Sequence, residues 1–312
     1  GGAPGECFFT ADGRYAFVSN YAMEGDGYSN PGCDGCHGSD LDGSFVYRIN
    51  TSSLRVEAAY PTGSVPKFLA LTPDERHLLV SNWSSGDVSI IDLVDAGCSE
   101  RIPVGRFPRG LAIDPGGRFA YVAIMGGSSI ERIDLLTRTV ERFATVGRGP
   151  RHLCLDSAGT TLYASLNHDG TIVKVDVATK EISRLHVGGS PRSMVFGREE
   201  RSLYVVNYSA ARISKVSLDD FTLADAAVTD SKPIGIAYDA INHRVWVACY
   251  SGSIVVFEDR DDERAVNGAS ASCVGADSCA ALAEIQRNTK HQRSMDIAPR
   301  TTHARASEVH AQ

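Results

Sequence analysis

The sequence predicts an all-β propeller made of four-stranded blades, and three observations support this fold class. Six segments resemble one another and recur at a nearly constant interval. Each contains runs in which apolar and polar residues alternate with a period of two, as in half-buried strands. Gly, Asp, Asn and Pro separate these runs where tight turns are needed. Repeats of about 40–45 residues with four short strands are typical of propeller blades.

A proline marks the start of each repeat. The intervals between successive prolines are 62, 42, 42, 41 and 42 residues. The first interval is longer because an insertion, about residues 22–43, joins the second and third strands of repeat 1. Without the insertion all intervals agree. The prolines are Pro4, Pro66, Pro108, Pro150, Pro191 and Pro233.

The third repeat illustrates the predicted blade. Turns at 115–117 and 126–127 separate its first three strands, because paired Gly and Pro residues favour tight turns. Its strands are expected at 110–114, 119–124, 129–134 and 140–146. Second strands follow the same pattern at 15–20, 77–82, 161–167, 202–207 and 244–249, and third strands at 43–50, 86–93, 170–177, 211–218 and 252–259.

The propeller is expected to span residues 1–258. The sixth repeat has no clear fourth strand, and six repeats are visible, with seven blades in the intact protein as the alternative. Residues 259–312 begin with a charge run and continue as a polar segment without periodicity. We expect this segment to be a mostly disordered tail.

Composition excludes some classes of protein. A net charge of −7 disfavours nucleic-acid binding, which depends on a basic surface. The sequence contains no run of eighteen apolar residues, so it predicts no transmembrane segment. The chain starts with Gly and shows no signal peptide, so we interpret it as a processed or trimmed segment. Eight cysteines, two pairs of which are close in sequence, favour an extracytoplasmic location, whether secreted, periplasmic or at the cell surface.

The strand endings carry a family resemblance. Second strands end in VSN, VSNW or VVNY, turns contain PD, PG or DG, and blades join through VG-x-x-P. Over residues 1–258 these motifs resemble the YVTN-repeat β-propeller family, which is similar to lactonase-like and quinoprotein amine dehydrogenase-like propellers. The resemblance implies the fold, commonly with seven blades, and frequent export, but no particular activity.

Basic residues follow four of the six prolines and are expected to form an arc at one mouth of the central channel. They are Lys67, Arg109, Arg151 and Arg192. Guanidinium groups bind carboxylates and phosphates in a forked geometry, so the arc predicts a site for a small anionic ligand. The alternative is that each cation pairs with a group of a neighbouring blade.

Aromatic residues and one histidine follow the second strands and are expected at the same mouth. Such a rim suits a small organic ligand or a peptide of a protein partner. The alternative is packing between blades. The predicted rim consists of Tyr21, Trp83, His168, Tyr208 and Tyr250.

Two residues break the repeat and are the candidates for catalysis. His152 follows Arg151, and Glu6 occupies an equivalent position in the first repeat. With an arginine to polarise a carbonyl, either one activates water in a lactonase-like mechanism. The alternative for His152 is a buried, hydrogen-bonded core residue.

The insertion contains Cys33-Asp34-Gly35-Cys36-His37. C-x-x-C-H is the attachment signature of c-type haem, in which the histidine ligates iron. A simple Cys33–Cys36 disulfide, free thiols, or a metal site that includes Cys33, Cys36, His37 and a fourth ligand are alternatives. Nearby carboxylates offer a weaker Ca²⁺ alternative.

The leading hypothesis from the sequence is therefore an exported, non-catalytic scaffold that binds a ligand or protein at the channel mouth. A lactonase-like hydrolase and a haem-carrying redox protein are the alternatives.

Overall fold

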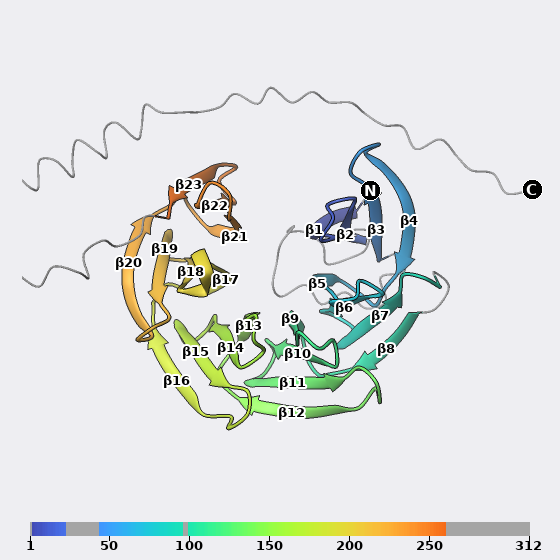
Figure 1. Ribbon diagram of the computed structural model, residues 1–312, viewed down its shortest axis with the longest axis horizontal. Coiled ribbons are helices and arrows are strands. Elements are labelled where there is room, and N and C mark those ends of the chain that lie inside the picture. Colours follow the sequence, from blue (N-terminus) through green and yellow to red (C-terminus); the bar gives the residue numbers. More distant parts are fainter. Residues whose placement is uncertain (1, 23–43, 96–98, 260–312) are drawn as a thin grey trace, which may run out of the picture. The chain divides into compact units, whose positions relative to one another are not determined.

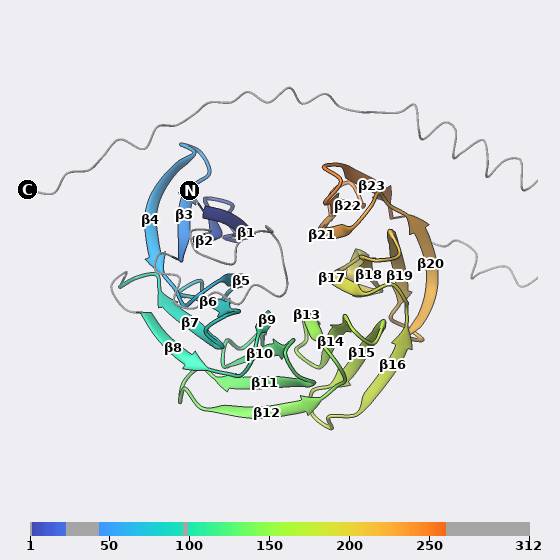
Figure 2. The same ribbon diagram turned by 180° about the vertical axis from the view of Figure 1, so that it is seen from behind.

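The computed structural model describes residues 2–22, 44–95 and 99–259. These residues form six antiparallel sheets in chain order, so the predicted all-β propeller with six visible blades is confirmed. Five sheets have four strands and the sixth has three, as expected for a repeat without a clear fourth strand. Within the unit Gly1–Arg260, the sheets follow one another in an arc, each with its first strand innermost (Figures 1 and 2).

The first three blades contain twelve strands. Blade 1 consists of β1 (Gly2–Phe9), β2 (Tyr15–Ala22), β3 (Phe45–Asn50) and β4 (Arg55–Pro61). Blade 2 consists of β5 (Pro66–Leu71), β6 (His77–Asn82), β7 (Asp87–Asp92) and β8 (Ser99–Pro103). Blade 3 consists of β9 (Pro108–Ile113), β10 (Phe119–Ile124), β11 (Ser129–Asp134) and β12 (Val140–Thr145).

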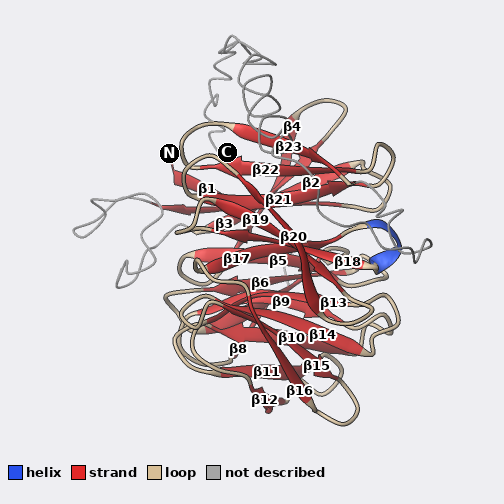
Figure 3. Ribbon diagram, turned by 90° about the vertical axis from the view of Figure 1, so that its left-hand side faces the viewer, coloured by secondary structure: helices blue, strands red, loops and turns tan. Residues whose placement is uncertain are grey.

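The last three blades contain eleven strands and one short 3-10 helix. Blade 4 consists of β13 (Pro150–Leu155), β14 (Thr161–Leu166), β15 (Thr171–Asp176) and β16 (Ile182–His186). Blade 5 consists of β17 (Pro191–Phe196), η1 (Arg198–Glu200), β18 (Ser202–Asn207), β19 (Arg212–Ser217) and β20 (Thr222–Val228). Blade 6 consists of β21 (Pro233–Asp239), β22 (Arg244–Cys249) and β23 (Ile254–Glu258). Figure 3 shows η1 at the edge of the stacked sheets.

Side chains build the turn between the first two strands in blades 1 and 2. In blade 2, the Thr72 hydroxyl donates to Asp74 and accepts the backbone N–H of His77 at 3.0 Å. Thr10 and Asp12 make the same pair in blade 1, at 2.7 Å. Such local hydrogen bonds satisfy backbone groups and stabilise the turn. The Thr and Asp side chains of these two repeats therefore stabilise the turns that join the first and second strands.

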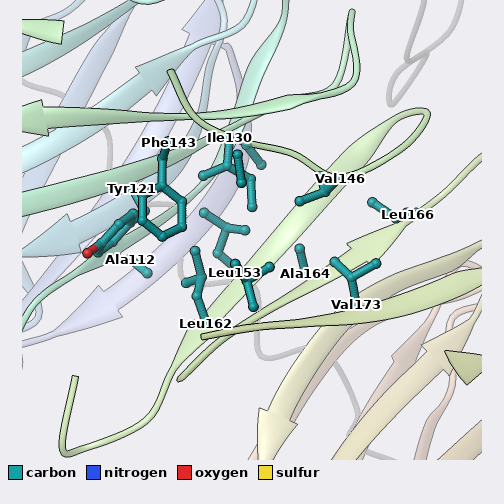
Figure 4. Packing of buried hydrophobic residues seen from close by; sticks show 13 residues of the cluster. Ala112, Tyr121, Ile130, Phe143, Val146, Leu153, Leu162, Ala164, Leu166 and Val173 are labelled. Atoms are coloured by element: carbon teal, nitrogen blue, oxygen red, sulfur yellow. The ribbon is translucent and has the colours of Figure 1, made fainter. Parts of the chain in front are cut away.

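The hydrophobic core is divided among the junctions between blades. Among the described residues, five clusters form, one between each pair of adjacent blades. Between blades 3 and 4, one cluster contains Tyr121 and Phe143 of blade 3 and Leu162 and Val173 of blade 4 (Figure 4). Full burial of one such side chain stabilises the fold by about 1.5–3 kcal/mol, so packing between blades is the main contribution that holds the inner strands in place.

Blade 6 has one apolar face that no described blade covers. Val245 and Val247 are buried in the cluster shared with blade 5. On the opposite face, Ile254 and Val256 are exposed and Trp246 is 41% exposed. The arc of described blades is open between blades 6 and 1 (Figure 1). This face therefore carries apolar side chains like those buried at the other blade junctions, but no described blade packs against it.

Candidate functional site

Antiparallel pairing brings the predicted basic and aromatic positions to one end of the blades. Pro66 at the start of β5 pairs with Asn82 at the end of β6, and Pro191 pairs with Asn207 in blade 5. Residues that follow the prolines therefore lie at the same end as residues that follow the second strands. We call this end the top face.

On the top face, three arginines contact a residue that follows a second strand. The guanidinium of Arg109 lies 5.5 Å from the ring centre of Trp83, and that of Arg192 lies 3.5 Å from the ring centre of Tyr208. Arg151 Nη1 lies 3.6 Å from the sulfur of Met125. Cations over aromatic rings are stabilised by the ring quadrupole. The basic and aromatic positions thus meet side chain to side chain.

Burial separates the four basic residues into two kinds. Arg151 and Arg192 are only 3% and 7% exposed, whereas Lys67 and Arg109 are half-buried. A buried guanidinium interacts more strongly with an anion than an exposed one, because less water screens the charge. Arg151 and Arg192 therefore lie within the top face and do not extend into solvent, whereas Lys67 and Arg109 are partly accessible.

Trp83 is packed between blades 2 and 3. Its ring is 2% exposed and stacks on Phe107, with ring centres 4.6 Å apart and an angle of 9° between the planes. Its indole Nε1 is buried and has no hydrogen-bond partner in the described structure. A buried N–H without an acceptor is costly, so a ligand acceptor at this point would be stabilised.

The remaining rim residues do not form a continuous ring. Tyr208 and Tyr250 meet edge to face, with ring centres 6.1 Å apart. His168 lies beside Gly149, where a Cβ atom would come within 2.8 Å of His168 Nδ1. Tyr21 belongs to β2, but its side chain lies outside the description. The described aromatics thus form two groups, one around Trp83 and one around Tyr208.

Glu6 and His152 share an electrostatic environment made by two arginines. Burial raises the pKa of Glu6 to about 7, against the opposing effect of Arg109 and Arg151. Burial first, and then the charges of Arg151 and Arg109, lower the pKa of His152 to about 3. Near neutral pH, His152 is therefore uncharged and Glu6 is divided between its acid and carboxylate forms. Of the two catalytic candidates, Glu6 has the pKa that suits proton transfer.

His152 is held by contacts from three directions. Its ring meets Phe68 of blade 2 edge to face, with centres 5.1 Å apart, and its backbone N–H donates to Ser165 at 3.1 Å. Its Nδ1 lies 3.8 Å from Cys154 Sγ. Burial raises the pKa of Cys154 to about 12, and the thiol also donates to the Met194 carbonyl at 3.5 Å. Cys154 is therefore a protonated thiol and not an activated nucleophile.

Serine residues contribute contacts that the sequence reading missed. Ser81 Oγ donates to the carbonyl of Arg109 at 2.6 Å, and Ser165 Oγ donates to the carbonyl of Arg192 at 2.7 Å. Each bond crosses from one blade to the next and fixes the backbone of a basic residue. The signal in the sequence is the serine near the end of these second strands, which directly precedes Asn82 in blade 2 and lies two residues before Asn167 in blade 4.

Several sequence expectations fall outside the described residues. Cys33, Cys36 and His37 lie in 23–43, so the haem, metal and disulfide alternatives stay predictions. Within the described ranges, no three His, Cys, Asp or Glu residues form a group able to hold a metal ion. Cys7, Cys154 and Cys249, also within these ranges, are free thiols. No described helix is long and apolar enough to cross a membrane.

Comparison with known proteins extends the fold assignment. The family model of the YNCE-like beta-propeller matches residues 39–222. A comparison of the sequence with curated proteins finds no match.

Solved structures with a similar fold differ in their functions. A candidate 6-phosphogluconolactonase from Bacteroides fragilis matches with a TM-score of 0.65 and 16% identity over 81% of this chain and 79% of that chain. Virginiamycin B lyase from Staphylococcus aureus matches with a TM-score of 0.62 and 13% identity over 83% and 85%. Hydrazine synthase from Kuenenia stuttgartiensis matches with a TM-score of 0.54 and 19% identity over 82% and 95%. At these identities the likeness concerns the fold alone.

Proposed function

The chain belongs to the YNCE-like β-propeller family, and on this premise we propose that it is an exported binding protein that holds a small anionic molecule at the top face. The propeller fold arranges the basic residues of this site, because the inner strands of successive blades place equivalent residues around one axis. The blades place Arg109, Arg151 and Arg192 at equivalent points. Export rests on the cysteine content and is tested by fractionation of the native host.

The observation that carries the proposal is the relation between Trp83 and Arg109. The indole N–H is buried without a described acceptor, and a guanidinium lies over the same ring. An anionic oxygen at this point would accept a hydrogen bond from the indole N–H of Trp83 and would also be attracted by the positive charge of Arg109. A hydrogen bond to a charged group contributes about 1.5–3 kcal/mol, which is enough to select anions over neutral analogues.

The test is isothermal titration calorimetry with D-gluconate and with inorganic phosphate. Trp83→Phe keeps an aromatic ring against Phe107 and removes only the N–H, so we expect affinity to fall by about tenfold or more. Arg118→Gln is the matched control, because Arg118 pairs with Asp134 at the opposite end of the blades. Failure of both anions to bind, or equal affinity in Trp83→Phe, would refute the proposal.

The pKa of Glu6 favours a second candidate, a lactonase-like hydrolase. A carboxylate with a pKa of about 7 beside Arg109 and Arg151 combines a general base with groups that stabilise an oxyanion. A candidate 6-phosphogluconolactonase is also among the proteins of similar fold. His152 is the weaker base, because its pKa is about 3.

This candidate is tested by following acid release from 6-phosphogluconolactone in a pH-stat. Enzymatic hydrolysis should rise with pH through about 7, and Glu6→Gln should lower kcat by about 100-fold or more with little change in KM. A rate equal to that of buffer, or an unaltered kcat in Glu6→Gln, would leave only the binding function.

A further inference from the structure

Alignment of the blades shows that blade 2 lacks a pair of large side chains that most other blades carry. The third residue of the second strand is aromatic in the other five blades but is Leu79 in blade 2. The aromatic residues are Phe17, Tyr121, Tyr163, Tyr204 and Trp246. All except Trp246 are buried in a junction with a neighbouring blade.

The cross-strand partner of this position is also exceptional in blade 2. Leu79 pairs with Ile90, whereas Tyr121 pairs with Arg132 in blade 3. Across the repeats the partner is basic in blades 1, 3, 4 and 5, namely Arg48, Arg132, Lys174 and Lys215. Blade 2 is thus the described blade in which both a buried aromatic ring and its cationic partner are replaced by aliphatic side chains.

In the other junctions these residues fill the space between blades. Tyr121 meets Phe143 at 4.8 Å between ring centres (Figure 4), and the guanidinium of Arg132 covers Phe119 at 4.4 Å. Tyr163 meets Phe196 of the next blade at 5.8 Å. Both phenol rings thus pack against a second aromatic ring at the edge of a blade junction.

Between blades 2 and 3 a cavity of about 400 Å³ takes this place. Leu79 and Ile90 contribute to its floor, and His77 stands where blade 3 has Phe119. The volume is within the range of about 300–1,000 Å³ that small-molecule sites occupy. Because the cavity lies at the turns between first and second strands, it is at the end opposite the top face.

We propose that this cavity binds a small neutral phenol, whose ring replaces the missing aromatic side chain of blade 2. The aliphatic floor suits the faces of an aromatic ring. Thr72, Asp74 and His77 line the cavity; the Thr72 hydroxyl is already bonded to Asp74, and the Asp74 carboxylate and the His77 imidazole provide partners for a hydroxyl group. The two lining arginines are already paired, Arg118 with Asp134 and Arg138 with Glu100, each at 3.0 Å. The lining therefore favours a neutral ring over a carboxylate.

The test uses p-cresol as the probe, observed by saturation-transfer NMR and titration. The double variant Leu79→Tyr/Ile90→Arg restores the pair found in blade 3, and we expect its affinity for p-cresol to fall by about tenfold or more. Benzoate should bind more weakly than p-cresol to the unaltered protein. Trp83→Phe at the top face is the control and should leave p-cresol binding unchanged.

A second variant keeps the test decisive if the double variant does not fold. His77→Phe fills the cavity from a half-buried position with the residue that blade 3 carries there, and it should also abolish p-cresol binding. Both variants should keep their affinity for D-gluconate, which separates this site from the top face. Absence of p-cresol binding, or undiminished binding in a folded His77→Phe protein, would overturn the proposal.

Discussion

The hydroxyl of Ser81 in blade 2 donates a hydrogen bond of 2.6 Å to the main-chain carbonyl of Arg109 in blade 3. Arg109 is therefore positioned by its own strand and by its neighbour. The same relation links Ser165 of blade 4 to Arg192 of blade 5. In blade 3 the equivalent residue is Ala123, which has no hydroxyl to offer. The junctions thus differ in how firmly they fix the basic residue that follows.

Ser81→Ala should lower the free energy of unfolding by about 1 kcal/mol, because a buried carbonyl loses its donor. It should also weaken D-gluconate binding, since Arg109 is no longer held from blade 2. Thermal unfolding and calorimetry measure the two effects. Ser89→Ala on the neighbouring strand β7 is the control for loss of a buried hydroxyl. An unchanged affinity in Ser81→Ala would show that the position of Arg109 does not depend on this bond.

Gly110→Ala should destabilise the junction of blades 3 and 4. A Cβ atom on Gly110 would lie 2.8 Å from the carbonyl oxygen of Arg151 and 2.9 Å from the Cα of His152. Such overpacking costs about 1–3 kcal/mol and displaces the backbone that carries both residues. Thermal unfolding should therefore occur at a lower temperature, and ligand binding at the top face should weaken.

Gly235→Ala is the matched control, because Gly235, like Gly110, is the second residue after the proline that starts its repeat. A Cβ atom there meets only Ala248 Cβ at 3.5 Å, an ordinary contact. Equal destabilisation by the two substitutions would mean that loss of glycine, and not the close approach to blade 4, causes the effect.

The repeat made most of the fold predictable. Strand boundaries expected from alternation and turn residues differ from those observed by at most two residues: 119–124 matches Phe119–Ile124, whereas 110–114 is observed as Pro108–Ile113. The contact between Arg109 and Trp83 also followed from the topology. In each antiparallel blade the start of the first strand lies beside the end of the second strand, so residues that follow these two points lie at the same end of the blades. Even the exceptional Leu79 was visible in the aligned second strands, although its meaning required the packing of the other junctions.

Other features could not be predicted because they depend on contacts between distant repeats. Glu6 and Arg151 are far apart in the chain, and only the arc of blades brings them into electrostatic range. The pKa of Glu6 then depends on how much water the surrounding side chains exclude, which composition does not reveal. Asp259 lies at the predicted boundary between the last strand, 252–259, and the polar tail, 259–312, and the sequence does not predict that it is buried against blade 5.

Glu6 should make stability fall as the pH rises from about 4.5 to about 7. Its pKa is raised from 4.5 to about 7 in the folded protein, so folding favours the protonated form. The stabilisation that Glu6 contributes to the folded protein is fully present below its pKa in the unfolded chain, and it is lost as the pH rises through its pKa in the folded protein. The slope is at most about 1.4 kcal/mol per pH unit. Unfolding by urea at several pH values measures it.

Glu6→Gln should remove this slope, because glutamine does not titrate. Glu181→Gln, at an exposed position before β16, is the control and should leave the slope in place. A slope that persists in Glu6→Gln would assign the pH dependence to another group.

Asp259 should stabilise the attachment of blade 6 to blade 5. Its carboxylate accepts hydrogen bonds from Tyr204 and from Tyr238 at 2.9 Å, and pairs with Lys215 at 2.9 Å. Although burial acts to raise it, the hydrogen bonds from Tyr204, Lys215 and Tyr238 hold the pKa of Asp259 below its usual value. Asp259→Asn should lower the free energy of unfolding by roughly 3 kcal/mol at neutral pH, since a buried ion pair loses one partner.

The acid dependence provides an independent check on Asp259. Because its folded pKa is depressed, its contribution is present above the usual value of 3.8 and is lost as the pH falls through the folded pKa. The difference in stability between the unaltered protein and Asp259→Asn should therefore shrink below about pH 4. Asp219→Asn, at an exposed turn after β19, changes the net charge equally and should have little effect on stability. A difference that stays constant down to acid pH would show that the charge of Asp259 does not contribute to the attachment.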